Sequence, residues 1–261
     1  MTKSLILFCL ITVIFQNKET IKERFIVPNG YKRVDASPNS FENHLQNLTL
    51  KPKNSLVKYY NGTIKPNNNI YEAVVNLPIG KKDLHQCADA IMRLRADYFY
   101  QKKAFDQIHF NFTNGFRVDY INWRNGERID LNGNKTYWIK KAEASDNQLN
   151  YWGYLETVFM YAGTASLAKE MRPTSKNQIK IGDVFIKGGF PGHAVIIVDI
   201  AVNPKSGKKA FLLAQSYMPA QEIQILKNPN ESNLSPWYSV DYSNELVTPE
   251  WTFKANELMK F

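Results

Sequence analysis

One cysteine and one histidine in this sequence have the placement expected of a nucleophile and its base. Cys87 follows the helix-capping residue Asp83 and falls on an apolar stripe, so it should lie near the start of a helix and face inward. A thiol attacks as its thiolate, and a helix N-terminus and a neighbouring imidazolium both lower the pKa of a thiol. His193 follows a glycine-rich loop and opens an apolar, β-branched run, which is typical of the start of a buried strand. We therefore predict that Cys87 is the nucleophile of a thiol hydrolase, with a lowered pKa, and that His193 is its base.

A polar side chain must orient such a histidine, and Gln215 is the strongest candidate. It ends an apolar stretch that should pair, as a strand, with the strand of His193, so a polar residue stands out there. Asp199 is the competing residue, but it lies six positions after His193 on one strand, about 20 Å away at the rise of a strand. Ser216 would suggest a serine hydrolase, yet the sequence has no Gly-x-Ser-x-Gly motif. Gln215 is therefore predicted to orient the imidazole.

The surrounding pattern predicts the elements that hold these residues. Apolar residues recur at helical spacing over residues 84–104, and a second helical stretch at 151–171 is interrupted at 162–164. Residues 105–150 carry repeated Asn-Gly turn signals and are expected to be irregular. From residue 178 onward the pattern changes to short strands. The chain thus predicts an α+β fold in which an antiparallel sheet packs on the cysteine-bearing helix.

The order of a helical cysteine, a strand histidine and a polar residue on the next strand resembles that of the papain-like hydrolases. Two runs, 181–186 (Ile-Gly-Asp-Val-Phe-Ile) and 192–198 (Gly-His-Ala-Val-Ile-Ile-Val), are similar to the NlpC/P60 branch of that superfamily. The resemblance implies a papain-like α+β fold. It also implies the roles of nucleophile, base and third polar residue for Cys87, His193 and Gln215.

The sequence departs from the NlpC/P60 pattern in two respects. Gln-Cys-Ala-Asp stands where the branch usually has Asp-Cys-Ser/Ala, and 106 positions separate Cys87 from His193, more than the branch leads one to expect. The resemblance therefore implies a hydrolase-like core at residues 83–226 with an inserted helical region at 105–177.

Four further runs carry a second resemblance. They are 86–95 (QCADAIMRLR), 161–164 (YAGT), 191–195 (PGHAV) and 213–221 (LAQSYMPAQ). These runs are similar to the bacterial domain-of-unknown-function family 4846, and the resemblance covers about residues 24–261. It implies no known activity.

The N-terminus has the features of a secretory signal. Lys3 precedes a largely apolar stretch at residues 4–15, and a polar run follows it. A charged start followed by 7–15 apolar residues is typical of a signal peptide, and the stretch is too short to span a bilayer comfortably. We predict a signal peptide over 1–20, one α+β domain over 21–261, a periplasmic or secreted location at the cell envelope, and no stable membrane insertion after cleavage. A buried N-terminal strand or helix is the alternative.

Composition limits the classes of protein and of partner. The chain has 261 residues, of which 44% are hydrophobic and 22% charged, and these values exclude collagen, coiled coils and wholesale disorder. The net charge of +9 could attract an anionic polymer, but the lysines are scattered rather than striped, so no nucleic-acid partner is expected. The four histidines and two cysteines form no metal-spaced motif, and neither a metal nor another cofactor is expected.

Together these features favour an exported thiol hydrolase of the amidase or peptidase type, acting on a peptide or a peptidoglycan-like substrate of the cell wall. Exposed aromatic residues suit contact with a sugar or a peptide, so we expect Trp152, Tyr217 and Trp237 to line the substrate groove, with core packing as the alternative. The cysteine also has a structural interpretation, because a lone cysteine on an apolar helix face usually packs inertly. The alternative function is a non-catalytic envelope binding protein that keeps the fold.

Overall fold

Two long neighbouring strands form the centre of the structure. The computed structural model describes residues 19–133 and 135–261. β9 (His193–Val202) and β10 (Lys209–Gln215) pair antiparallel through a turn in which Gly207 has a φ of 71°. Nearly every residue of both strands is buried, which explains their almost unbroken apolar, β-branched sequence.

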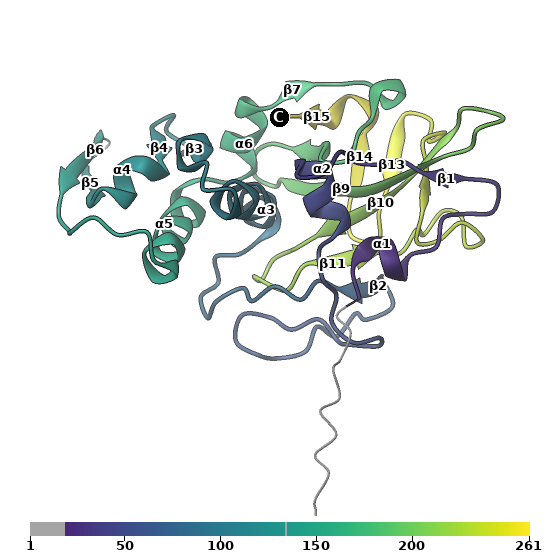
Figure 1. The fold of residues 1–261 in the computed structure, drawn as a ribbon, viewed down its shortest axis with the longest axis horizontal. Coiled ribbons are helices and arrows are strands. Elements are labelled where there is room, and N and C mark those ends of the chain that lie inside the picture. The colour runs from purple at the N-terminus through teal and green to yellow at the C-terminus, as the bar shows by residue number, and fades with distance from the viewer. Residues whose placement is uncertain (1–18, 134) are drawn as a thin grey trace, which may run out of the picture.

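The main sheet is antiparallel throughout and has the order β2-β11-β10-β9-β8-β15-β7 (Figure 1). β1 and β12 add to it at the far ends of β9 and β10. The strands that flank the central pair are β1 (Lys32–Arg33), β2 (Tyr71–Val74), β7 (Arg172–Pro173), β8 (Val184–Lys187), β11 (Gln224–Leu226), β12 (Tyr238–Ser239) and β15 (Leu258–Lys260). The predicted α+β class and antiparallel sheet are therefore present.

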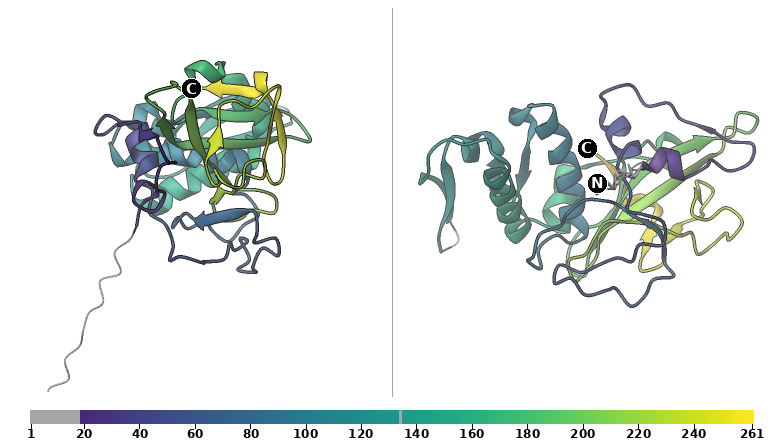
Figure 2. Two further views of the ribbon diagram at one scale, coloured as in Figure 1. Left: turned by 90° about the vertical axis from the view of Figure 1, so that its right-hand side faces the viewer. Right: turned by 60° about the horizontal axis from the view of Figure 1, so that its bottom comes forward.

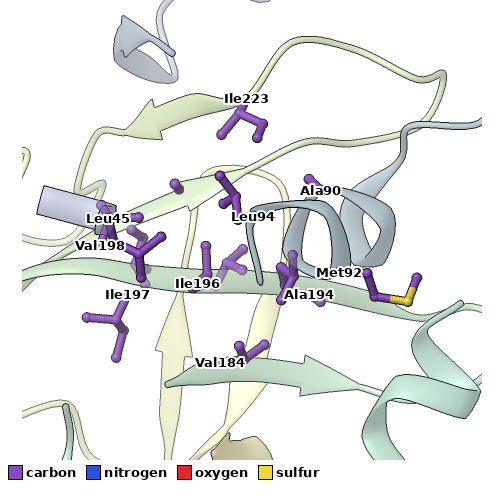
Figure 3. Packing of buried hydrophobic residues seen from close by; sticks show 14 of the residues in the cluster. Leu45, Ala90, Met92, Leu94, Val184, Ala194, Ile196, Ile197, Val198 and Ile223 are labelled. Carbon is purple, nitrogen blue, oxygen red and sulfur yellow. The ribbon is translucent and has the colours of Figure 1, made fainter. Parts of the chain in front are cut away.

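The cysteine-bearing helix α3 (Cys87–Gln101) packs on the central strand β9. Figure 3 shows Ala90 and Leu94 of this helix beside Ala194 and Ile196 of the strand. Burying one side chain the size of leucine or isoleucine stabilises a fold by about 1.5–3 kcal/mol, so this contact fixes the helix on the sheet. The start of the helix is thereby held over the start of the strand.

The boundaries of α3 differ from the predicted range 84–104. The helix begins at Cys87 with Gln86 as the N-cap, so the cysteine is the first helical residue rather than one turn inside. Asp83 does not cap it, because its Oδ1 accepts a hydrogen bond from the backbone N–H of Ala220 (2.6 Å) instead. Asp83 thus ties the approach to the helix to the loop that follows β10.

The second predicted helical stretch is found as two helices, α5 (Gln148–Tyr161) and α6 (Thr164–Glu170), separated at the predicted break. α5 begins earlier than predicted because Asn147 is its N-cap, accepting a hydrogen bond from the N–H of Asn150 (2.8 Å). The remaining α-helices are short: α1 (Ile21–Arg24), α2 (Phe41–Gln46) and α4 (Tyr120–Arg124).

The region 105–150 is not irregular, contrary to the prediction. It holds α4 and two hairpins, β3 (His109–Asn111) with β4 (Arg117–Asp119) and β5 (Glu127–Asn132) with β6 (Lys135–Lys140). Two of the Asn-Gly signals are hairpin turns, at Gly115 and Gly133, whereas Asn125-Gly126 ends α4, and all three glycines have positive φ. With α5, these elements gather on the side of α3 that faces away from the sheet (Figure 1, Figure 2).

A separate hairpin, β13 (Glu245–Val247) with β14 (Thr252–Lys254), packs on the sheet at β8. Phe253 packs against Phe185 of β8, with ring centroids 5.9 Å apart. Three 3₁₀ turns complete the described elements: Phe105–Gln107, Lys176–Gln178 and Ala255–Glu257.

The predicted signal peptide over residues 1–20 lies, up to residue 18, outside the described residues. None of the helices in the described ranges is both long and apolar enough to cross a membrane.

Candidate functional site

The structure brings Cys87 and His193 together although they are far apart in sequence. Each is the first residue of its element, α3 and β9, and the two starts meet. The backbone N–H groups of Ala88 and Ala194 lie near enough to the Cys87 sulfur to favour its thiolate, and Ala194 directly follows the histidine. Both side chains are buried, with 8% of Cys87 and 1% of His193 exposed, and no hydrogen bond joins these two described residues directly.

Gln215 lies beside the imidazole, where a third polar residue is expected. It is the last residue of β10, and its Oε1 is 2.9 Å from Nε2 of His193. Asp199 forms an ion pair with Arg33, with 2.8 Å between Oδ2 and Nε, so it does not compete for the histidine. Ser216 points elsewhere, because its hydroxyl lies within hydrogen-bonding distance of the carbonyl oxygens of His85 (2.9 Å) and Gln221 (2.7 Å).

Two residues that the sequence analysis did not identify extend this contact inward. Nε2 of Gln215 donates to Oε2 of Glu250 (2.6 Å), and Nζ of Lys65 lies 2.7 Å from the same oxygen. Lys65 also donates to Oε1 of Gln221 (2.9 Å). Both charged residues lie in loops, Lys65 after a short bridge and Glu250 before β14, and neither has a local sequence signal that connects it to His193.

Three aromatic rings enclose the imidazole. The ring centroids of Tyr217, Trp251 and Phe253 lie 4.7, 5.5 and 5.8 Å from that of His193. This burial, with the positive charge of Lys65, lowers the pKa of His193 to about 4, although the hydrogen bond to Gln215 acts in the opposite direction. The imidazole is therefore neutral near pH 7.

The predicted lowering of the Cys87 pKa is wrong for this arrangement of the site. Burial is the largest influence and the carboxyl group of Asp89 the next, and together they raise the pKa of Cys87 to about 11. The backbone N–H groups at the start of α3 favour the thiolate, but loss of solvation outweighs them. The resting pair is therefore a neutral thiol beside a neutral imidazole.

Asp89 is a further buried group next to the cysteine. Its Oδ2 accepts the N–H of Gln86 (3.0 Å), whereas its Oδ1 is buried without a hydrogen-bond partner. Burial raises the pKa of Asp89 well above its usual range. The packing of α3 on the sheet removes Asp89 from solvent.

The three predicted substrate-binding residues separate in space. Tyr217 lies against the imidazole, as described above. Trp152 lies on α5, stacks on the guanidinium of Arg93 (4.8 Å) and lines a hollow of about 850 Å³ along α3 and α5, so it belongs to another part of the surface. Trp237 is 2% exposed, and its indole N–H donates to the carbonyl of Ile26 (3.0 Å), so it is a core residue and the prediction of an exposed groove residue is wrong.

Two apolar side chains are exposed on the loops at the His193 end of the sheet. Phe190, 97% exposed, lies in the loop that joins β8 to β9, and Met218 follows Tyr217 after β10. The loop of Phe190 is linked to α6, because Thr164 Oγ1 donates to the carbonyl of Gly189 (3.1 Å). The β8–β9 loop thus presents an aromatic side chain to solvent.

Comparisons with known proteins give a family but no activity. The family model described as "Domain of unknown function (4846)" matches residues 21–260. Neither the curated proteins nor the solved structures gave a significant match. Among the described residues, no group of three or more His, Cys, Asp or Glu side chains is arranged to hold a metal ion.

Proposed function

This chain belongs to the family described as domain of unknown function (4846), and we propose that it is a thiol hydrolase of the amidase or peptidase type with a papain-like core. One observation carries the proposal: the thiol at the start of α3 lies against the His193–Ala194 peptide while Nε2 of His193 is held by Gln215. A helical cysteine, a strand histidine and a polar residue on the next strand are the parts that such an enzyme requires.

Because Cys87 and His193 are both neutral, the proposed reaction couples nucleophilic attack to proton transfer between them. As the Cys87 sulfur attacks the carbonyl carbon of an amide, its proton passes to His193, and the S–C bond forms. The histidine then gives that proton to the leaving amine as the C–N bond breaks. Water, deprotonated by the same imidazole, cleaves the thioester and releases the carboxylate and the free thiol. Backbone N–H groups near the start of α3 are positioned to stabilise the oxyanion.

The proposed substrate is a peptide, and specifically a cell-wall peptide met outside the cytoplasm. The exposed side chains of Phe190 and Met218 offer apolar contacts beside the site, and Tyr217 offers an aromatic one. The net charge of +9 suits an anionic envelope polymer.

Covalent trapping tests the proposal. In a Cys9→Ser background Cys87 is the single thiol, and a peptide with an electrophilic ketone warhead should add one mass equivalent to the native protein. His193→Ala should slow this addition by about a hundredfold, because general-base assistance is lost. Cys87→Ser should abolish hydrolysis of a fluorogenic peptide amide while leaving the thermal unfolding temperature unchanged. A Cys87 that reacts only after denaturation would rule out the hydrolase.

A second candidate function is a non-catalytic envelope binding protein that keeps this fold. The observation that favours it is the burial of both Cys87 and His193, which leaves the thiol with a raised pKa. For such a protein, Cys87→Ala should bind peptidoglycan fragments as tightly as the wild type, and neither form should cleave them. Sedimentation with cell-wall material, followed by mass spectrometry of the released products, separates the two functions.

A further inference from the structure

We infer that Glu250, anchored by Lys65, is a positioning residue that selects the tautomer of His193 through the side-chain amide of Gln215. The inference rests on the proposed function, because it specifies which ring nitrogen of His193 acts as the base. It adds two residues to the site, Lys65 and Glu250, that no sequence motif identifies.

The two hydrogen-bond partners of the Gln215 amide fix its orientation. An amide has one end that donates and one that accepts, and the two ends differ only in their hydrogen-bond partners. A carboxylate can only accept, so the 2.6 Å contact to Glu250 must come from the NH₂ group of Gln215. The oxygen of the amide is therefore the atom that lies 2.9 Å from His193.

The orientation of this amide determines which nitrogen of the His193 imidazole carries the proton. Because Oε1 of Gln215 accepts, Nε2 of His193 must carry the proton, and Nδ1 is then the ring nitrogen with a free lone pair. With the amide reversed, Nε2 would accept and Nδ1 would hold the proton, so the neutral ring could not take a proton from the thiol through Nδ1. The carboxylate of Glu250 thus determines which nitrogen is the base.

Lys65 holds the carboxylate of Glu250 in place. Lys65 is only 3% exposed and lies 2.7 Å from the same Oε2 that receives the amide of Gln215. Its ammonium group also donates to Oε1 of Gln221, which in turn accepts from Gln224 (3.1 Å). Buried polar groups are costly unless they are paired, so a connected chain of this kind fixes one orientation for each member.

The tautomer can be measured without any assumption about catalysis. In protein labelled with ¹⁵N-histidine, the two ring nitrogens of neutral His193 give distinct signals for the protonated and unprotonated atom, and His193→Gln assigns them. We expect the wild type to show a proton on Nε2 only. Glu250→Leu should leave the amide free to turn, so that the Nδ1–H form becomes populated.

Two control variants and one further test variant complete the experiment. Glu250→Gln keeps an acceptor oxygen, which Lys65 continues to orient, so the tautomer should stay as in the wild type. Lys65→Met should weaken the selection, because the carboxylate loses its anchor. Glu245→Leu removes an exposed glutamate from the neighbouring strand β13 and should change nothing.

Kinetics then connect the tautomer to the reaction. With a fluorogenic peptide amide, Glu250→Leu should lower kcat by about tenfold or more, with KM almost unchanged, and Glu250→Gln should retain most of kcat. If the protein hydrolyses nothing but Glu250→Leu still shifts the tautomer, the proposed function fails and the positioning role stands. A wild type with the proton on Nδ1, or a folded Glu250→Leu with the tautomer unchanged, would overturn the inference.

Discussion

At the scale of single residues, the environment of Cys87 and His193 decides their protonation more than their identity does. The aromatic rings around His193 and the packing of α3 remove water from both groups, and a dry environment penalises the charged form of each. The pair therefore rests neutral between about pH 4 and about pH 11.

Alkylation against pH tests the neutral pair. In the Cys9→Ser protein, the rate of iodoacetamide reaction with Cys87 should rise only in alkaline buffer, with a midpoint well above that of a free thiol at about 8.5. His193→Ala should move the midpoint downward, because removing the ring admits water to the thiol. An ion pair would give the opposite result, namely reaction in mildly acidic buffer and an upward shift in His193→Ala.

Stability against pH tests the burial of the histidine. Its pKa of about 4 in the folded chain lies below the usual 6.5, so the unfolded chain binds the proton first as the pH falls. His193 therefore contributes stability above pH 6.5 that is lost between pH 6.5 and 4, roughly 3 kcal/mol in all. Glu170, whose pKa burial raises to about 7, acts with the opposite sign, so the wild-type curve alone is not diagnostic.

The measurement is urea unfolding of the wild type and His193→Gln at several pH values. The free energy of unfolding of the wild type relative to the variant should fall by that amount between pH 6.5 and 4. A constant difference over this range would mean that the histidine is solvated in the folded chain.

At the scale of elements, the site depends on how the start of α3 is held. Asp83 binds the backbone N–H of Ala220 and the side chain of Gln86 (3.2 Å), so it connects the approach to the helix with the loop after β10. The same end of the sheet carries the β8–β9 loop with the exposed Phe190. The loops between elements therefore set both the position of the thiol and the side chains exposed beside it.

Asp83→Ala should affect both stability and activity. Loss of the two hydrogen bonds should cost about 1–2 kcal/mol in the free energy of unfolding. It should also lower kcat, because the start of α3 is no longer fixed against the sheet. Asp35→Ala, which removes an exposed aspartate elsewhere, is the matched control. Normal stability and activity in Asp83→Ala would show that packing alone positions the helix.

Phe190→Ala separates a substrate contact from a structural one. The side chain is almost fully exposed, so the unfolding temperature should stay within 1 °C or so, since exposed positions contribute little. KM for peptides with an apolar residue next to the scissile bond should rise several-fold. Ile26→Ala, also exposed, serves as the control, and an unchanged KM in Phe190→Ala would exclude the contact.

At the scale of the whole molecule, the sheet and the elements beyond α3 have separate roles. The sheet carries the histidine and its glutamine, and nearby loops carry Lys65 and Glu250, whereas α4, α5 and the two hairpins lie on the far side of α3 (Figure 1). The two tryptophans that were expected in one groove belong to these different parts.

Tryptophan substitutions test this division. Trp237→Ala removes a core side chain and should lower the free energy of unfolding by about 3–5 kcal/mol, or the unfolding temperature by about 10 °C. Trp152→Ala, at a half-buried position on α5, should cost less than half as much. Differential scanning calorimetry of both variants measures the comparison, and equal losses would contradict the assignment.

The sequence by itself determined the main elements that carry the candidate site and three of its residues. Hydrophobic periodicity depends only on near neighbours, so the helix of Cys87, the break before α6 and the central strand of His193 were predictable. Gln215 was predictable on the same local basis, because it is a polar residue at the end of an apolar strand.

Only the tertiary structure decided the rest. Glu250 reaches Gln215 from a loop 35 positions away, Lys65 reaches Glu250 from a loop 185 positions away, and no local pattern encodes such contacts. The pKa values of Cys87 and His193 were also beyond the sequence, because a helix N-terminus predicts a reactive thiolate only if water or a cation remains nearby. Burial depends on which surfaces meet, and here the closure of α3 and three aromatic rings over the pair reversed the expected protonation.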